Sequence, residues 1–247
     1  MTSVVALPVT STRPTSEVTG PPVVFVHGFA ANGASDWPAD RWAAPLAEAG
    51  RAAVVVHLPG HVGGPAVASP DEVTTAHLLQ RLAAGVAEAV GGGEVDLVGY
   101  SLGARLAWDL AAGKVLPVRR LVLGGLSPME PFGAVDLDTA RAAVQGGPRP
   151  ADPLTGMITG MVSGEGQDPA SLLNVVEGLA REPFDPAATA PEVPTLFLAG
   201  QGDPMSQGVE QVVARVAGAQ LEHVPGDHFG ALAGDEFRAA VFRFLEV

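Results

Sequence analysis

The sequence predicts an α/β protein in which a mostly parallel sheet carries helices on both faces. Short β-branched runs alternate along the chain with longer amphipathic stretches, which favours parallel strands joined by crossover helices. The runs are almost continuously apolar, as expected for strands buried on both faces. The predicted strands are Val23–His27, Ala52–Leu58, Val95–Gly99, Val118–Leu123, Pro194–Ala199 and Ala219–Val224, and Val4–Val9 is a candidate edge strand.

Helical patterns fill most of the intervals between these strands. The longest opens at Ser69-Pro70-Asp71, where proline suits the first turn of a helix, and the glycine run 91–93 ends it. The predicted helices are Asp40–Ala49, Ser69–Val90, Leu102–Ala112, Gln207–Ala217 and Phe229–Leu245.

One segment interrupts the alternation. Residues 127–191 contain no convincing strand, only the helix-like stretches Asp138–Gln145 and Ala170–Arg181 between Pro- and Gly-rich links. We expect this segment to be a helical lid inserted over the sheet. Residues 1–126 and 192–247 would then form the α/β core.

Composition excludes several classes of function. The 247 residues are 47% hydrophobic and 17% charged, which is sufficient for a sizeable core and argues against disorder. A net charge of −13 disfavours nucleic acid as a partner. The absence of cysteine excludes disulfides, thiolate metal sites and a cysteine nucleophile. Without a signal-peptide pattern or a long apolar run, we expect a soluble cytoplasmic protein that does not bind membranes; the sequence does not indicate an oligomeric state.

The strongest motif is Gly99-Tyr100-Ser101-Leu102-Gly103, which matches G-x-S-x-G between a predicted strand and a predicted helix. A nucleophile on such a sharp turn needs neighbours without a Cβ atom, and both flanking glycines meet that need. The backbone N–H of Leu102 would lie at a helix N-terminus, where a developing oxyanion is stabilised. An ordinary Gly/Ser turn is the alternative, which the strand–turn–helix context disfavours.

A serine nucleophile needs a base, and an imidazole base needs a carboxylate to orient it. His228 follows the last predicted strand, and Asp203 follows the strand before it. Because parallel strands end at one edge of the sheet, both residues should lie near Ser101. The sequence therefore predicts a catalytic triad of these three residues. Asp227 and Glu130 are the alternatives for the acid.

From about Val23 onward, the chain resembles the α/β-hydrolase superfamily. In that family an H-G-x turn supplies the second oxyanion amide, which here implies the N–H of Phe29 in His27-Gly28-Phe29, with the histidine structural. The stretch 58–61 resembles the family's D-x-P-G-H-G segment, but His57 replaces the usual Asp and Val62 the usual Gly. This departure puts the geometry of that loop in doubt rather than catalysis.

The resemblance implies a serine hydrolase that forms an acyl-enzyme on Ser101 and needs no metal or organic cofactor. The expected substrate is a small to medium, mainly apolar carboxylic ester or lactone. No Arg or Lys cluster adjoins the motifs, so anionic substrates are disfavoured, although Arg141, Arg149 and Arg181 lie in the insertion. The candidate substrate-binding residues are Trp37, Tyr100, Met129, Met157, Met161, Met205 and Phe229.

Three alternatives remain open. The same triad could serve C–C bond hydrolysis, perhydrolysis, or a lyase or cyclase step. The chain could instead be a non-catalytic small-molecule binding protein. The apolar residues of the insertion could also simply hold it to the sheet. Epoxide hydrolases and haloalkane dehalogenases resemble this fold but need a carboxylate where this chain has Ser101.

Overall fold

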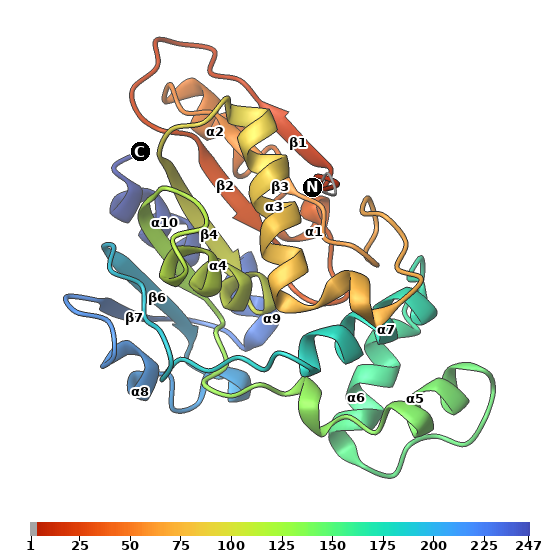
Figure 1. Cartoon of the computed structure of the whole chain (residues 1–247). Coiled ribbons are helices and arrows are strands. Elements are labelled where there is room, and N and C mark those ends of the chain that lie inside the picture. Colours follow the sequence, from red (N-terminus) through yellow and green to blue (C-terminus); the bar gives the residue numbers. More distant parts are fainter. Residues whose placement is uncertain (1–3) are drawn as a thin grey trace.

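The computed structural model describes residues 4–247 and contains a seven-stranded sheet in the order β1-β3-β2-β4-β5-β6-β7 (Figure 1). Six strands are parallel, and β1 pairs antiparallel with β3. The predicted fold class is confirmed. The strands are β1 Val9–Thr12, β2 Val23–Val26, β3 Ala53–Val56, β4 Val95–Tyr100, β5 Val118–Gly124, β6 Thr195–Gly200 and β7 Gln220–Val224.

Helices cover both faces of the sheet. Successive residues of a strand point to opposite faces, so Val24 packs in one core with α3 and α4, while Phe25 packs in the other with α2 and α10. The helices are α1 Gly33–Asp36, α2 Ala43–Glu48, α3 Thr75–Val90, α4 Leu102–Ala112, α5 Leu137–Val144, α6 Pro153–Val162, α7 Pro169–Ala180, α8 Glu210–Val213, α9 His228–Ala233 and α10 Asp235–Leu245. Short 3₁₀ turns are η1 Pro70–Val73, η2 Phe132–Ala134 and η3 Pro204–Ser206.

The edge strand lies later in the chain than predicted. Residues 4–8 of the predicted strand Val4–Val9 form no strand, and β1 begins at Val9 and continues through polar residues. Thr10 pairs with Val55, and the Thr10 hydroxyl hydrogen-bonds to His57 Nε2 at 2.8 Å. An edge strand with one solvent-exposed face does not need an apolar run, so hydrophobicity gave the wrong bounds.

Two long predicted helices are interrupted at single residues. Thr74 has an extended backbone and caps α3, which separates η1 from α3. Gly234 has an extended backbone and separates α9 from α10. The predicted helix Gln207–Ala217 shortens to α8, and Asp40–Ala49 shortens to α2.

The chain between β5 and β6 holds η2, α5, α6 and α7, and these helices gather beyond one end of the sheet (Figure 1). We call residues 127–191 the helical segment. Helix α7 packs closely on η1, since a Cβ at Gly178 would lie 2.6 Å from the carbonyl oxygen of Pro70. Among residues 4–247, none of the helices combines the length and the apolar character that crossing a membrane requires.

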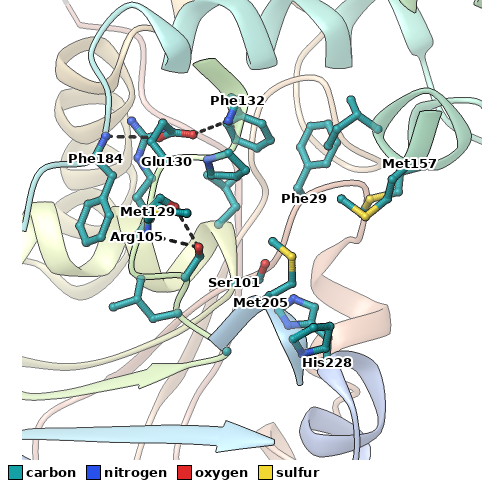
Figure 2. Close-up of a pocket in the computed structure, with 18 of the residues that line it drawn as sticks. Phe29, Ser101, Arg105, Met129, Glu130, Phe132, Met157, Phe184, Met205 and His228 are labelled. Atoms are coloured by element: carbon teal, nitrogen blue, oxygen red, sulfur yellow. Dashed lines mark hydrogen bonds and ion pairs between the residues drawn. The ribbon is translucent and has the colours of Figure 1, made fainter. Parts of the chain in front are cut away.

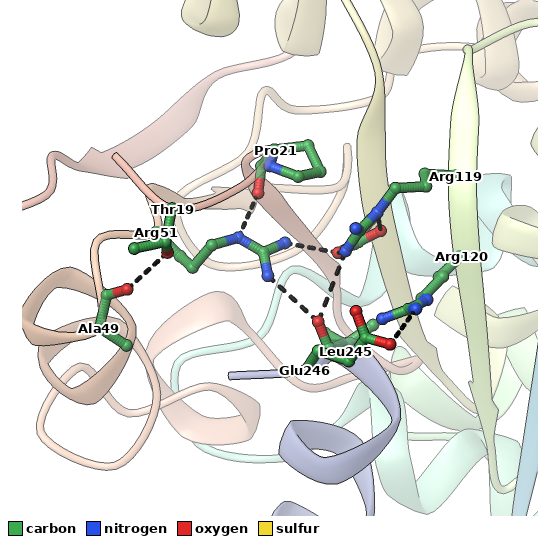
Figure 3. A network of polar contacts seen from close by, with 9 residues as sticks. Thr19, Pro21, Ala49, Arg51, Arg119, Arg120, Leu245 and Glu246 are labelled. Carbon is green, nitrogen blue, oxygen red and sulfur yellow. Dashed lines mark hydrogen bonds and ion pairs between the residues drawn. The ribbon is translucent and has the colours of Figure 1, made fainter. Parts of the chain in front are cut away.

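A buried ionic network fixes the C-terminal helix at the opposite end of the sheet (Figure 3). Asp96, at the start of β4, is fully buried and accepts hydrogen bonds from Arg51 and Arg119. Arg51 also donates to the carbonyl oxygens of Pro21 and Leu245. Because Leu245 ends α10, the network joins that helix to the end of the sheet remote from Ser101.

Candidate active site

Ser101 lies on a strained turn between β4 and α4. Its φ of 53° and ψ of −116° are unusual for a residue with a side chain. The flanking glycines permit this turn: a Cβ at Gly99 would lie 2.2 Å from the Gly103 oxygen, and one at Gly103 would lie 2.1 Å from the Val26 oxygen. The turn places Ser101 directly after the carboxyl end of β4.

His228 and Asp203 meet beside this turn. His228 Nδ1 lies 2.8 Å from Asp203 Oδ2, and the backbone carbonyl of His228 accepts a hydrogen bond from the Tyr100 hydroxyl. Asp203 also accepts from the Ser206 hydroxyl at 2.7 Å and from the Met205 amide at 2.8 Å. Burial opposes ionisation of Asp203, but the hydrogen bonds from His228 and Ser206 hold its pKa below the usual value. The carboxylate is therefore ionised and fixed against the imidazole.

Both alternative acids are engaged elsewhere. Asp227 caps α9, where its Oδ1 accepts from the amides of Phe229 and Gly230 at 3.2 and 2.8 Å. Glu130 pairs with Arg105 and accepts from the amides of Phe132 and Phe184. Neither carboxylate hydrogen-bonds to His228.

The Ser101 hydroxyl makes no hydrogen bond with a group among residues 4–247, yet Ser101 and His228 line one cavity together (Figure 2) and also share a second. The hydrogen bond that proton transfer requires would thus form as substrate binds. Within the same part of the chain, the N–H groups of Phe29 and Leu102 donate to no protein acceptor. Two unpaired N–H donors beside a serine hydroxyl suit the binding of an oxyanion.

Two buried histidines support the turn that carries Phe29. His27 bonds the Gly28 oxygen at 2.9 Å and accepts from the Leu58 amide at 3.1 Å. The His61 ring packs edge-on against Phe29, with 5.8 Å between ring centroids. Burial, together with the charges of the neighbouring histidines, lowers the pKa of His27 to about 3, and burial lowers that of His61 to about 4. Both rings are neutral near pH 7 and brace the loop.

The first cavity beside Ser101 has a volume of about 300 Å³. Its walls are almost entirely apolar, and the helical segment supplies many of the side chains (Figure 2). Of the candidate substrate-binding residues, Met129, Met157, Met161, Met205 and Phe229 line it. Tyr100 instead lines the second cavity.

Trp37 lines neither cavity, which corrects its assignment as a substrate-binding residue. Only 2% of Trp37 is exposed, and its ring packs against Phe25 and Trp42 with centroid separations of 4.9 and 5.0 Å. The tryptophan follows the loop that carries Phe29, but its side chain turns into the core on the α2 and α10 face of the sheet. It is therefore a core residue.

The sequence did not single out Arg105, which lines the first cavity one helical turn after Ser101. Arg105 is 5% exposed and pairs with Glu130, and its Nη2 donates to the carbonyl oxygens of Leu179 and Glu182. The ion pair makes this wall electrically neutral and ties α4 to both ends of the helical segment. Its position on α4, four residues after Ser101, was the available signal.

Among residues 4–247, no cluster of three or more His, Cys, Asp or Glu side chains has a geometry that could hold a metal ion.

The model of the alpha/beta hydrolase family matches residues 23–240. A comparison with curated protein sequences gives no match.

Solved structures resemble this chain over nearly its whole length. The enol-lactonase from Burkholderia xenovorans LB400 has a TM-score of 0.72 at 18% identity, over 97% of this chain and 96% of its own. MenH from S. aureus has a TM-score of 0.73 at 20% identity, over 96% of this chain and 97% of its own. A hydrolase from Pseudomonas aeruginosa PA01 has a TM-score of 0.71 at 21% identity, over 97% of this chain and 94% of its own. At these identities the likeness is one of fold.

Proposed function

Because the chain belongs to the alpha/beta hydrolase family, we propose that it is a serine hydrolase acting on a small to medium, mainly apolar carboxylic ester or lactone. One observation carries the proposal. The imidazole of His228 is hydrogen-bonded to the buried Asp203 and shares a cavity with Ser101, which lies on a strained turn. This arrangement suits an activated hydroxyl nucleophile.

In the proposed mechanism, His228 Nε2 takes the Ser101 proton as the hydroxyl attacks the substrate carbonyl. The N–H groups of Phe29 and Leu102 stabilise the oxyanion, and the ionised Asp203 stabilises the imidazolium. His228 then protonates the leaving alkoxide, which leaves an acyl-enzyme. Water activated by the same imidazole releases the acid.

The first cavity supports an apolar substrate. Its volume of about 300 Å³ is at the small end of the range for ligand pockets. Arg105, the cationic side chain in its wall, is neutralised by Glu130. Met129, Met157 and Met161 come from the helical segment, so we propose that this segment is the lid over the cavity. Flexible thioethers suit an adaptable apolar wall.

Labelling with a fluorophosphonate tests whether the chain is a hydrolase or only binds small molecules. We expect the wild type to be labelled at Ser101 and to hydrolyse p-nitrophenyl hexanoate. Ser101→Ala should abolish both, whereas Ser163→Ala, which removes an exposed hydroxyl at the end of α6, should retain both. Circular dichroism checks that the variants are folded. Hydrolysis that survives Ser101→Ala would refute the proposal.

A further inference from the structure

A second cavity, of about 290 Å³, adjoins the first, and Ser101, Phe29 and His228 line both. Its walls come from α1, α9 and the loops beside them, together with Met161 of α6. They include the polar residues Ser35, Asp36 and Arg41. A carbonyl group held at Ser101 therefore has unlike surroundings on its two sides. The first cavity has almost entirely apolar walls, in which Arg105 and Glu130 pair with each other, whereas the walls of the second cavity are more polar.

Asp36 lies close to the nucleophile. A Cβ added to Gly28 would be 3.5 Å from Asp36 Oδ2 and 3.5 Å from Ser101 Cβ, so a single glycine separates the carboxylate from the serine. The Gly28 amide donates to Asp36 Oδ2 at 2.8 Å. This bond fixes the carboxylate at the edge of the second cavity.

The other oxygen of Asp36 retains acceptor capacity. Its nearest donor is the Ser35 hydroxyl at 3.4 Å, but that hydroxyl has one proton and lies 3.0 Å from the Asn32 carbonyl oxygen. Among residues 4–247, no cationic side chain forms an ion pair with Asp36. Burial raises the pKa of Asp36, although the Gly28 amide opposes the shift. A half-buried carboxylate without a full set of donors is stabilised by a donor on a bound ligand.

Arg41, the cationic side chain of the second cavity, does not compensate for Asp36. Its guanidinium donates to Asp235 at 3.0 Å, and a third of the side chain is exposed. The charge of Arg41 is thus already paired on the outer side of the cavity. Asp36 is therefore a carboxylate close to Ser101 that no ion pair among residues 4–247 neutralises.

We propose that the second cavity binds a hydrogen-bond donor of the substrate, a hydroxyl or an ammonium group, on Asp36 Oδ1 while the apolar part occupies the first cavity. The inference rests on the proposed function, since it assumes that an ester is held at Ser101. The substrate class is then an amphiphilic ester or lactone with a donor a few bonds from the scissile carbonyl. A carboxylate or phosphate at that position is repelled.

A set of hexanoate esters with matched alcohols tests this selectivity. The alcohols are 2-methoxyethanol, which has no donor once esterified, ethylene glycol, 2-(dimethylamino)ethanol, which carries a donating ammonium near neutral pH, and glycolate, which is anionic. A second set places the same head groups on the acyl side of hexyl esters. The two sets together test both orientations of the ester relative to Asp36.

In one of the two sets we expect kcat/KM for the hydroxyl and ammonium substrates to exceed that of the methoxy substrate at least tenfold, and the anionic substrate to fall at least tenfold below it. The order of the hydroxyl and ammonium substrates shows which donor is preferred. Asp36→Asn should remove the ammonium preference and the penalty on the anion. Asp40→Asn, which removes an exposed charge in the same region of the chain, should leave the preferences of the wild type unchanged.

Equal kcat/KM values across both sets, or unaltered preferences in Asp36→Asn, would overturn the inference. Failure of the proposed function gives a different result, in which no ester is hydrolysed and no fluorophosphonate label appears. In that event, calorimetric binding of the same esters to Ser101→Ala still measures the selectivity. At least tenfold tighter binding of a hydroxyl ester than of its methoxy counterpart supports the inference, and equal binding overturns it.

Discussion

Lowering the pH from 7 to 4.5 should destabilise the folded protein through His27 and His61. Both side chains are almost inaccessible to solvent, at 0% and 3% exposed, and their pKa values fall from 6.5 to about 3 and about 4. Below pH 6.5 the unfolded chain binds two protons that the folded chain excludes. Stability is therefore full above pH 6.5 and is lost as the pH falls toward the folded-state values.

The magnitude follows from these values. Each histidine contributes a loss of about 2 to 3 kcal/mol between pH 7 and 4.5, at 1.36 kcal/mol per pKa unit. Asp109 acts in the opposite direction, because burial raises its pKa to about 6 and the folded protein gains that proton first. Protonation of Asp109 stabilises the folded state by about 2 kcal/mol over this pH range, so the net loss of stability is about 3 kcal/mol. His57, with a lowered pKa, and Asp36, with a raised one, contribute in opposite directions.

Urea unfolding followed by circular dichroism between pH 7 and 4.5 measures this loss. In His61→Gln the loss should be smaller by about 2 kcal/mol, because the unfolded chain then takes up one histidine proton that the folded chain excludes rather than two. His77→Gln, at an exposed position on α3, is the matched control and should retain the loss seen in the wild type. An identical pH dependence in the wild type and His61→Gln would refute the reasoning.

Three further predictions concern the triad, the turn at Ser101 and the buried ionic network. Asp203→Asn should lower kcat by about 10⁴ while the protein stays folded, because the amide favours the wrong histidine tautomer; a loss below tenfold in ester hydrolysis would contradict this role. Gly103→Ala should lower the unfolding free energy by about 3 kcal/mol, since its methyl group would collide with the Val26 oxygen, whereas Gly160→Ala, in open space on α6, should raise it by about 1 kcal/mol. Urea titrations test that pair, and equal effects would exclude the collision. Asp96→Ala should destabilise by about 3–5 kcal/mol because it leaves Arg51 buried without its carboxylate. Glu192→Ala, at the exposed pair with Lys114, should leave the stability almost unchanged; similar melting temperatures for the two variants would refute the difference.

The sequence predicted the six parallel strands to within one or two residues at nearly every end. These strands are buried on both faces, so nearly every position is apolar and the pattern is unambiguous; β7, at the edge, is more exposed. The turn around Ser101 was predictable for a related reason. Backbone oxygens approach Gly99 and Gly103 so closely that no other residue fits. Local constraints of this kind are recorded directly in the residue types.

Features that depend on contacts between distant residues were not predictable. Helix α6 was missed although Asp152 and Pro153 form a start signal like that of Ser69 and Pro70, because its glycines weaken the helical pattern. The direction of the Trp37 side chain depends on packing against Trp42 and β2. The pairing of Arg105 with Glu130 requires the folded helical segment. Each outcome depends on tertiary packing rather than on local propensity.

The neutral wall formed by Arg105 and Glu130 has a consequence for how such proteins diversify. On the proposed function, the substrate charge that the first cavity accepts depends on the pairing of two wall residues, Arg105 and Glu130, that are not part of the proposed triad. Replacing Glu130 with glutamine would remove the carboxylate paired with this guanidinium, although Asp109 and Glu182 would remain as nearby negative charges. The first cavity would become more cationic, with Ser101, His228 and Asp203 unchanged. Chains with the same reacting groups can thus differ in substrate charge by a single side chain.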